Sequence, residues 1–246
     1  MLTFLRIAAV AAALSLVPTA SLGFSTVPAE ATARPAVQRQ ALKAAPAADF
    51  FGLDHGHQHD SGLAPGQTAQ DFQAWLSVSP ANRDGVVAFR DYLAAQGVAS
   101  VVPMWQLTRT SSSWRQCGAE PFEVPPADKW DRIVKTLKFV RDDVIPAVGA
   151  VETLSAYRNE KLNACSDGAP KSAHREFFAL DLTPVNAALD RADMIRSVCV
   201  AHARDGRAYD AGLGFYTGRR FHVDSSGFRK WGPNGKGATS PCVDYA

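Results

Sequence analysis

The chain has 246 residues, 46% of them hydrophobic and 20% charged, and its nearly balanced acids and bases leave a net charge of +2. This length and apolar content can build one domain with a substantial core but scarcely two large ones. A nucleic-acid partner is not expected, because the sequence lacks the basic stripe that such binding requires.

The first residues have the layout of a secretory signal peptide. Arg6 precedes an apolar stretch over residues 7–17, and the small residues Ala20, Ser21 and Gly23 follow it. We therefore predict a signal peptide over residues 1–23. The apolar run is shorter than the roughly 20 residues of a membrane-spanning helix. We expect an exported protein, periplasmic or extracellular, with no stable membrane span after cleavage of the signal.

Residues 24–70 are rich in Ala, Pro, Gln and Gly and carry no sustained apolar periodicity, which is typical of a flexible spacer. Within this spacer, residues 54–60 (DHGHQHD) alternate histidines with other residues. We interpret this tract as a solvated linker with incidental metal affinity, because a disordered tract imposes no coordination geometry.

Residues 71–246 are predicted to form one domain of the α+β class, with a small, mostly antiparallel sheet flanked by helices. The first helix carries Val86, Phe89 and Leu93 on one face and ends at Gly97, and a buried strand is expected over 98–107. A second helix begins after Pro125-Pro126 and is stopped by Pro146. The later predicted elements are strands at 151–157 and 177–182, a helix at 187–203, and strands at 213–216 and 221–224.

Four cysteines, an even number in an exported chain, predict two disulfides. Three pairings are possible. We favour Cys117 with Cys165 and Cys199 with Cys242, because the second bond would fix the C-terminal tail. A four-cysteine zinc site is the weaker alternative, since the sequence has no C-x-x-C pair.

Two imidazoles and a carboxylate, His174, Asp181 and His222, are a natural three-ligand zinc set with one position left for water. Seven residues of straight strand would span about 23 Å and direct His174 and Asp181 to opposite faces. The segment must therefore be helical or bend after His174, and its apolar residues favour the bend. In the alternative without a metal, all three are ordinary structural residues, but a buried acid in an apolar strand is costly unless it is paired or metal-bound.

Several short motifs follow one another in a familiar order: Ser155-Ala156-Tyr157-Arg158, Ser172-x-His174, Ala179-x-Asp181, and Gly214-x-Tyr216 leading to Phe221-His222-x-Asp224. Over about residues 125–231 the chain resembles the zinc D-alanyl-D-alanine carboxypeptidase family. The resemblance implies that His174, Asp181 and His222 bind Zn²⁺, that Arg158 faces the substrate carboxylate, and that Ser172 helps to hold the substrate.

The same resemblance implies a metallopeptidase, a hydrolase that uses metal-activated water to cut D-alanine-containing bonds in peptidoglycan stem peptides of the cell wall. Whether it would act as a carboxypeptidase or an endopeptidase stays open. An arginine suits the substrate-binding role, because its fork matches a carboxylate with two parallel hydrogen bonds.

The general base is where the sequence departs from this family, whose better-known members carry Glu-x-x-His, Asp-x-x-His or His-x-His at the second motif. Arg219 and Arg220 stand there instead, and we expect them to form a solvated turn. Asp224 is the preferred catalytic base, with Glu176 and Asp210 as weaker candidates. Asp224 is equally suited to orienting His222.

The missing base motivates a second hypothesis, a catalytically inactive, zinc-containing module that binds the cell wall. A third hypothesis is a metal-free structural domain, whose stability would not respond to chelators.

Overall fold

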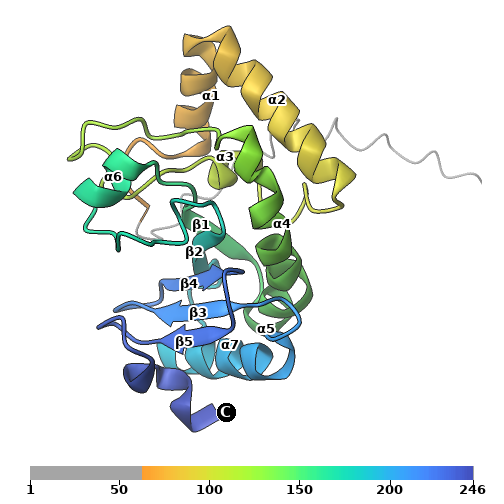
Figure 1. The fold of residues 1–246 in the computed structure, drawn as a ribbon, viewed down its shortest axis with the longest axis vertical. Helices are drawn as coiled ribbons and strands as arrows, with labels where there is room; N and C mark the ends of the chain where they lie inside the picture. The colour runs from red at the N-terminus through yellow and green to blue at the C-terminus, as the bar shows by residue number, and fades with distance from the viewer. Residues whose placement is uncertain (1–62, 246) are drawn as a thin grey trace, which may run out of the picture. The chain divides into compact units, whose positions relative to one another are not determined.

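The structure is a computed structural model that describes residues 63–245. The predicted signal peptide, most of the predicted spacer and its histidine tract lie outside the described residues. Helices and one five-stranded sheet make up the described fold, so the predicted α+β class is confirmed (Figure 1). None of the helices between residues 63 and 245 has the length and apolarity that a membrane span needs.

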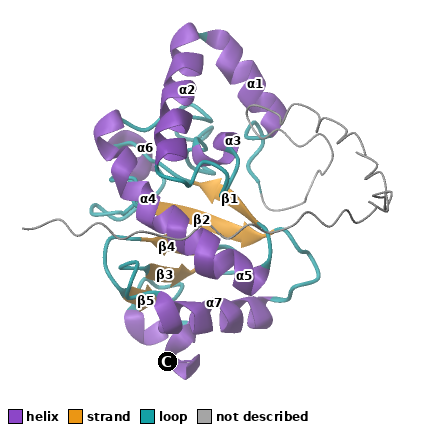
Figure 2. Ribbon diagram, turned by 90° about the vertical axis from the view of Figure 1, so that its right-hand side faces the viewer, coloured by secondary structure: helices purple, strands orange, loops and turns teal. Residues whose placement is uncertain are grey.

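The sheet has the strand order β1-β2-β4-β3-β5, and every neighbouring pair is antiparallel except β3 with β5. All residues of β1 to β4 are buried. Figure 2 shows α4, α5 and α7 packed on one face of the sheet. The strands are β1 (Val151–Ser155), β2 (Ala179–Pro184), β3 (Gly212–Phe215), β4 (Phe221–Asp224) and β5 (Arg229–Trp231).

The folded part begins ahead of residue 71, the predicted start of the domain. Thr68 caps α1 in a reciprocal capping box with Asp71, which satisfies backbone donors at the helix start. Gln67 is fully buried, and its carbonyl accepts a hydrogen bond from the buried side chain of Arg109 at 2.9 Å. The helices that follow are α1 (Ala69–Val78), α2 (Pro80–Ala95), α3 (Met104–Leu107), α4 (Trp130–Phe139), α5 (Ile145–Val148), α6 (Glu160–Cys165) and α7 (Arg191–Asp205).

Of two sequence predictions about helices, one is confirmed and one is wrong. The helix carrying Val86, Phe89 and Leu93 is confirmed as α2, with these side chains buried and Gly97 following it at a φ of 71°. Pro146, in contrast, does not stop the second helix. A π-helical turn, Val140–Val144, separates α4 from α5, and Pro146 lies at the start of α5, where a missing N–H is tolerated.

The predicted strand over residues 98–107 is wrong. This segment forms turns and then the short helix α3, with Val98, Val102 and Leu107 buried. A short apolar run cannot be assigned to strand or helix by periodicity alone, and Pro103 at the N-cap of α3 lacks the N–H that a strand ladder needs. The sequence also did not predict α6 or β5.

The two favoured disulfides are both present. Cys117–Cys165 joins the loop after α3 to the end of α6, and Cys199–Cys242 joins α7 to the 3₁₀ helix Pro241–Tyr245 at the C-terminus. The second bond therefore fixes the C-terminal tail, as the sequence predicted.

Candidate metal centre

Adjacent antiparallel strands bring two of the three predicted ligands together. Asp181 on β2 lies directly opposite His222 on β4, so their side chains project from the same face of the sheet. His174 lies in the turn before β2, and Phe177 takes a positive φ of 57° between them. The chain thus bends after His174, as predicted.

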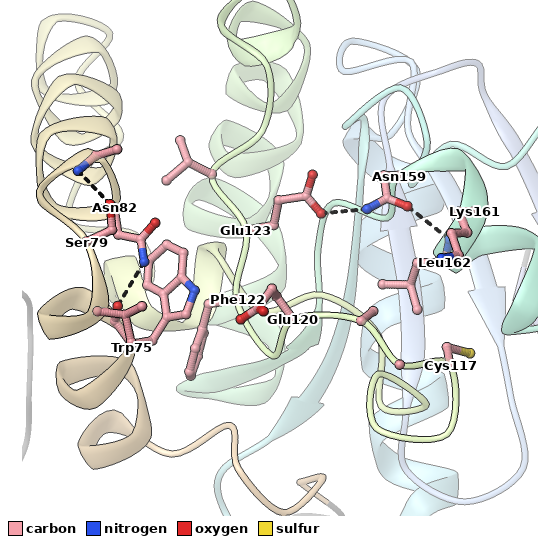
Figure 3. Close-up of a pocket in the computed structure, with 15 residues that line it drawn as sticks. Trp75, Ser79, Asn82, Cys117, Glu120, Phe122, Glu123, Asn159, Lys161 and Leu162 are labelled. Carbon is pink, nitrogen blue, oxygen red and sulfur yellow. Dashed lines mark hydrogen bonds between the residues drawn. The ribbon is translucent and has the colours of Figure 1, made fainter.

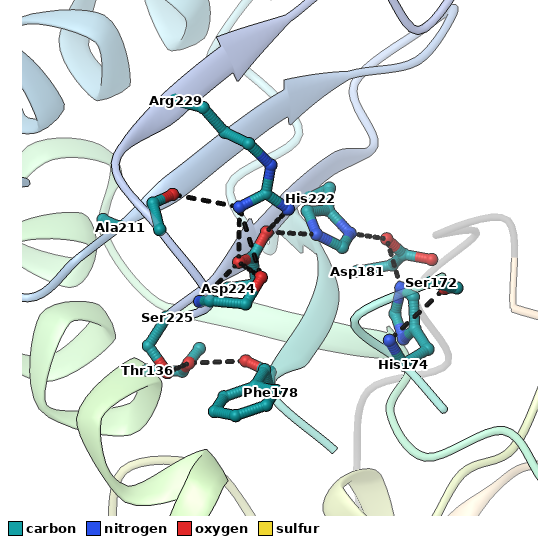
Figure 4. Close-up of polar contacts among 12 residues, drawn as sticks. Thr136, Ser172, His174, Phe178, Asp181, Ala211, His222, Asp224, Ser225 and Arg229 are labelled. Carbon is teal, nitrogen blue, oxygen red and sulfur yellow. Dashed lines mark hydrogen bonds and ion pairs between the residues drawn. The ribbon is translucent and has the colours of Figure 1, made fainter. Parts of the chain in front are cut away.

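One ligand atom from each of His174, Asp181 and His222 lies within 4.8 Å of the others, and all three side chains are buried. These three residues are called the His/Asp/His cluster below. Figure 4 shows the two imidazoles on either side of the Asp181 carboxylate.

His174 presents a lone pair to this cluster. Its Nδ1 lies 2.6 Å from the carbonyl oxygen of Ala156, so Nδ1 carries the hydrogen that it donates. Burial, reinforced by the charge of Arg158, lowers the pKa of His174 to about 4, so the ring is neutral at neutral pH. Its Nε2 then has no hydrogen, lies 3.2 Å from Asp181 Oδ1, and has no hydrogen-bond partner among the described residues. Two facing acceptors repel each other unless a cation lies between them.

His222 is oriented from behind by a second carboxylate. Its Nε2 lies 2.8 Å from Asp224 Oδ2, and its Nδ1 lies 3.2 Å from Asp181 Oδ1. Burial alone would lower the pKa of His222, but hydrogen bonds with Asp181 and Asp224 outweigh burial and raise it. Without a metal, a proton on Nδ1 would therefore occupy the direction in which a metal ion would be bound.

Asp181 divides its two oxygens between different partners. Oδ1 faces both imidazoles and accepts a hydrogen bond from the Tyr216 hydroxyl at 2.9 Å. Oδ2 accepts from Arg158 Nη2 at 2.7 Å and from Arg220 Nη2 at 2.6 Å. Burial would raise the pKa of Asp181, but its interaction with the protonated form of His174 and with the charge of Arg220 lowers it well below its usual value. Asp181 is therefore an anionic ligand with one oxygen left for a cation.

Tyr216 remains a neutral donor beside this carboxylate. Burial, together with the negative charge of Asp181, raises the pKa of Tyr216, so its hydroxyl keeps its hydrogen at any working pH. The Trp231 ring lies 5.3 Å from the Tyr216 ring and 5.4 Å from the His222 ring. It thus covers the cluster from β5.

Asp224, the predicted base, has both oxygens occupied. Oδ1 accepts hydrogen bonds from Ser226 N, Ser226 Oγ and Arg229 Nη1, and Oδ2 accepts from Arg229 Nη2 and faces His222 Nε2. Burial would raise the pKa of Asp224, but His222 and Arg229 lower it. Figure 4 shows Asp224 on the opposite side of His222 from Asp181.

The other predicted site residues lie at varied positions. Arg158 contacts the cluster through Asp181, whereas Ser172 accepts a hydrogen bond from the backbone N–H of His174 at 3.3 Å. Glu176 pairs with Lys129 and Arg132. Asp210 pairs with Lys135 at 2.5 Å.

Sequence reasoning missed the contact between Arg220 and the cluster. The pair Arg219-Arg220 was expected to be a solvated turn, yet only Arg219 turns away, donating to the carbonyls of Pro184 and Asn186. The available signal was the position of Arg220 two residues before His222, directly ahead of β4, because period-two alternation gives both side chains the same side of the sheet.

A pocket of about 690 Å³ lies apart from the cluster (Figure 3). Its walls come from the α1–α2 connection, residues 117–124 and α6. Trp75 and Phe122 give it an aromatic side, and Glu123 accepts a hydrogen bond from Asn159 at 2.9 Å. None of its lining residues belongs to the His/Asp/His cluster, although Asn159 directly follows Arg158 in the chain.

No family model, no curated protein and no solved structure matches this chain.

Proposed function

We propose that this protein is an exported zinc-dependent peptidase that hydrolyses D-alanine-containing bonds of peptidoglycan stem peptides. The observation that carries the proposal is the convergence of two imidazole nitrogens on one buried carboxylate oxygen, with His174 Nε2 lacking any hydrogen-bond partner in the described part of the chain. The D-alanine specificity rests on the motif resemblance described above.

The donor set fits zinc. His174 Nε2, His222 Nδ1 and Asp181 Oδ1 would hold the ion, and two nitrogens with one oxygen leave a fourth tetrahedral position open. When bound, zinc supplies a Lewis acid that polarises a peptide carbonyl and lowers the pKa of water. Two neutral imidazoles and one carboxylate would leave a charge of +1 at the centre (2 − 1), which suits that role.

The surrounding residues of the chain prepare this site. Asp224 fixes the hydrogen of His222 on Nε2 and so directs the Nδ1 lone pair inward. Arg158 and Arg220 keep Asp181 ionised. Tyr216 keeps its hydroxyl hydrogen and donates it to Asp181 Oδ1, which helps to hold that carboxylate in place.

A second candidate function is favoured by one observation. Within residues 63–245, Asp224 accepts hydrogen bonds with both oxygens, and Asp181 accepts two with Oδ2 while its Oδ1 faces the position that a metal would take. Neither is free to take a proton from water. A zinc-containing module that binds the cell wall without turnover would need no such base.

Zinc content and hydrolysis, measured together, test both functions. Purified full chain and its His222→Ala variant are incubated with peptidoglycan and with a peptide ending in D-Ala-D-Ala, with and without a chelator. The matched control is His202→Gln, since His202 is buried in α7 and bonds to the carbonyl of Ala211 instead.

Zinc-dependent product release that His222→Ala abolishes and His202→Gln retains would support the peptidase. Bound zinc with binding to peptidoglycan but no product would support the second candidate. A purified protein that takes up no zinc would contradict both.

A further inference from the structure

Two guanidinium groups share a single carboxylate oxygen at the cluster. Arg158 Nη2 and Arg220 Nη2 lie 2.7 Å and 2.6 Å from Asp181 Oδ2. One negative charge cannot neutralise two positive ones, so this part of the site carries an excess positive charge even before a metal ion is counted. Such an excess favours an anionic ligand.

The two arginines differ in their accessibility. The side chain of Arg158 is only 10% exposed and donates its Nε–H to Ser155 Oγ at 3.0 Å, so it is committed to the protein interior. The side chain of Arg220 is 27% exposed. Arg220 is therefore the guanidinium that an incoming ligand would meet.

Arg220 is also held in place. Its Nη1 donates to Ser112 Oγ at 3.1 Å, and its guanidinium lies 5.3 Å from the centre of the Tyr216 ring. Its Nε–H is buried and has no acceptor among the described residues, whereas Nη1 and Nη2 each carry two hydrogens, of which these bonds use one each. A fixed and incompletely used guanidinium fork binds a carboxylate at a smaller entropic cost than a mobile surface arginine does.

We propose that Arg220 is a specificity-determining residue that binds a free carboxylate of the ligand beside the His/Asp/His cluster. The inference rests on the proposed function in placing the ligand at this cluster. It implies a substrate or ligand that ends in a carboxylate next to the bond presented to the metal site, hence removal of a terminal residue rather than cleavage inside a peptide.

A different role is possible for the same contacts. Arg220 could act only through Asp181, keeping that ligand ionised and in position. The two roles are separable, because a residue that acts only on Asp181 would alter zinc binding, whereas a carboxylate-binding residue would alter the preference between ligands.

The test measures binding of two small probes to the zinc-loaded full chain by nuclear magnetic resonance titration: N-acetyl-D-alanine, with a free carboxylate, and its C-terminal amide. The variants are Arg220→Gln, which removes the charge, and Arg220→Lys, which keeps it without the fork. Arg219→Gln is the matched control from the same turn, since Arg219 bonds to backbone carbonyls instead of Asp181. Zinc content is measured for every variant.

We expect the wild type to bind the carboxylate probe about tenfold or more tightly than the amide, the range of a hydrogen bond to a charged group. Arg220→Gln should lose this preference, Arg220→Lys should keep part of it, and Arg219→Gln should keep all of it. Because this readout needs no turnover, it survives if the protein proves to be a binding module and fails separately from the peptidase proposal.

Three results would overturn the inference. One is a wild type that binds both probes equally, and another is a preference that persists in Arg220→Gln. The third is loss of zinc from both Arg220 variants, which would make Arg220 a positioning residue for Asp181.

Discussion

The contact between Asp224 and His222 gives the sharpest test of the metal centre. Three donors, Ser226 N, Ser226 Oγ and Arg229 Nη1, point at Asp224 Oδ1, whereas Oδ2 faces His222 Nε2 and Arg229 Nη2. In an Asp224→Asn variant, the amide oxygen will take the Oδ1 position because more donors require an acceptor there. The amide NH₂ then faces His222.

This change reverses the hydrogen bond at His222. An NH₂ group donates to Nε2, which moves the ring hydrogen to Nδ1, the atom that faces Asp181 Oδ1 at 3.2 Å. Zinc must displace that hydrogen before it can bind. Losing the orienting partner of a metal-bound histidine typically weakens metal affinity by about 10- to 100-fold, which corresponds to about 1.4–2.7 kcal/mol.

The assay is a competition for zinc between the protein and a chelator of known affinity, with Asp210→Asn as the control because Asp210 pairs with Lys135 at the surface. Asp224→Asn should lose zinc at a chelator concentration that leaves Asp210→Asn and the wild type loaded. A zinc affinity within about twofold of the wild type would refute the orienting role. If hydrolysis were lost while zinc affinity was kept, Asp224 would act as the general base instead.

Three further outcomes are expected. Removing zinc with a chelator should lower the thermal midpoint, since zinc at 100 times its dissociation constant contributes about 2.7 kcal/mol; an unchanged midpoint would argue against a metal in the folded protein. Gly214→Ala should cost about 1–3 kcal/mol in denaturant unfolding, because its Cβ would overlap the Trp231 ring, whereas Gly85→Ala on α2 has room; equal stabilities would contradict this packing. Burial lowers the pKa of His202, so the folded protein binds a proton there less readily than the unfolded chain, and stability is lost as pH falls from about 6.5 toward that lower pKa. With a chelator present, His202→Gln should lose less stability over this pH range than the wild type. Parallel curves of stability against pH would contradict the assignment.

The elements that could be predicted from sequence are those with strong local signals. The period of Val86, Phe89 and Leu93 marks α2, and the alternation around His222 marks β4, because each pattern matches one repeating geometry. The segment 98–107 lacks such a pattern. Its apolar residues fill the core from turns and from α3, and only the tertiary structure decides which side chain faces inward.

In the candidate site, too, some features could be predicted from the sequence and others could not. His174, Asp181 and His222 could be named from residue type and spacing, and the need for a bend followed from strand geometry. The contact of Arg220 with Asp181 could not, because it depends on a side chain reaching across from β4 to β2. Sequence spacing places Arg220 at a turn, where an arginine is usually solvated.

The choice between Asp224 as base and as orienting partner also needed tertiary information. Period two puts Asp224 on the same face as His222, which fits both roles. Arg229 and Ser226 favour the orienting role, since they bond to both oxygens of the carboxylate and Arg229 helps to hold its pKa down, and Arg229 lies on β5, a strand that the sequence did not predict.

Arg220 links the metal centre to the identity of its ligand. A carboxylate at this position would take a proton from water, but it would also repel a ligand carboxylate and place a second negative charge beside Asp181. A guanidinium does the reverse, because it stabilises the ionised Asp181 and attracts an anionic ligand. An arginine instead of a carboxylate at this position therefore weakens proton transfer and strengthens recognition of a ligand carboxylate. If turnover is found, a proton acceptor must come from the ligand, from water or from Asp224 after rearrangement; if none is found, the same residues form a zinc-dependent carboxylate-binding site.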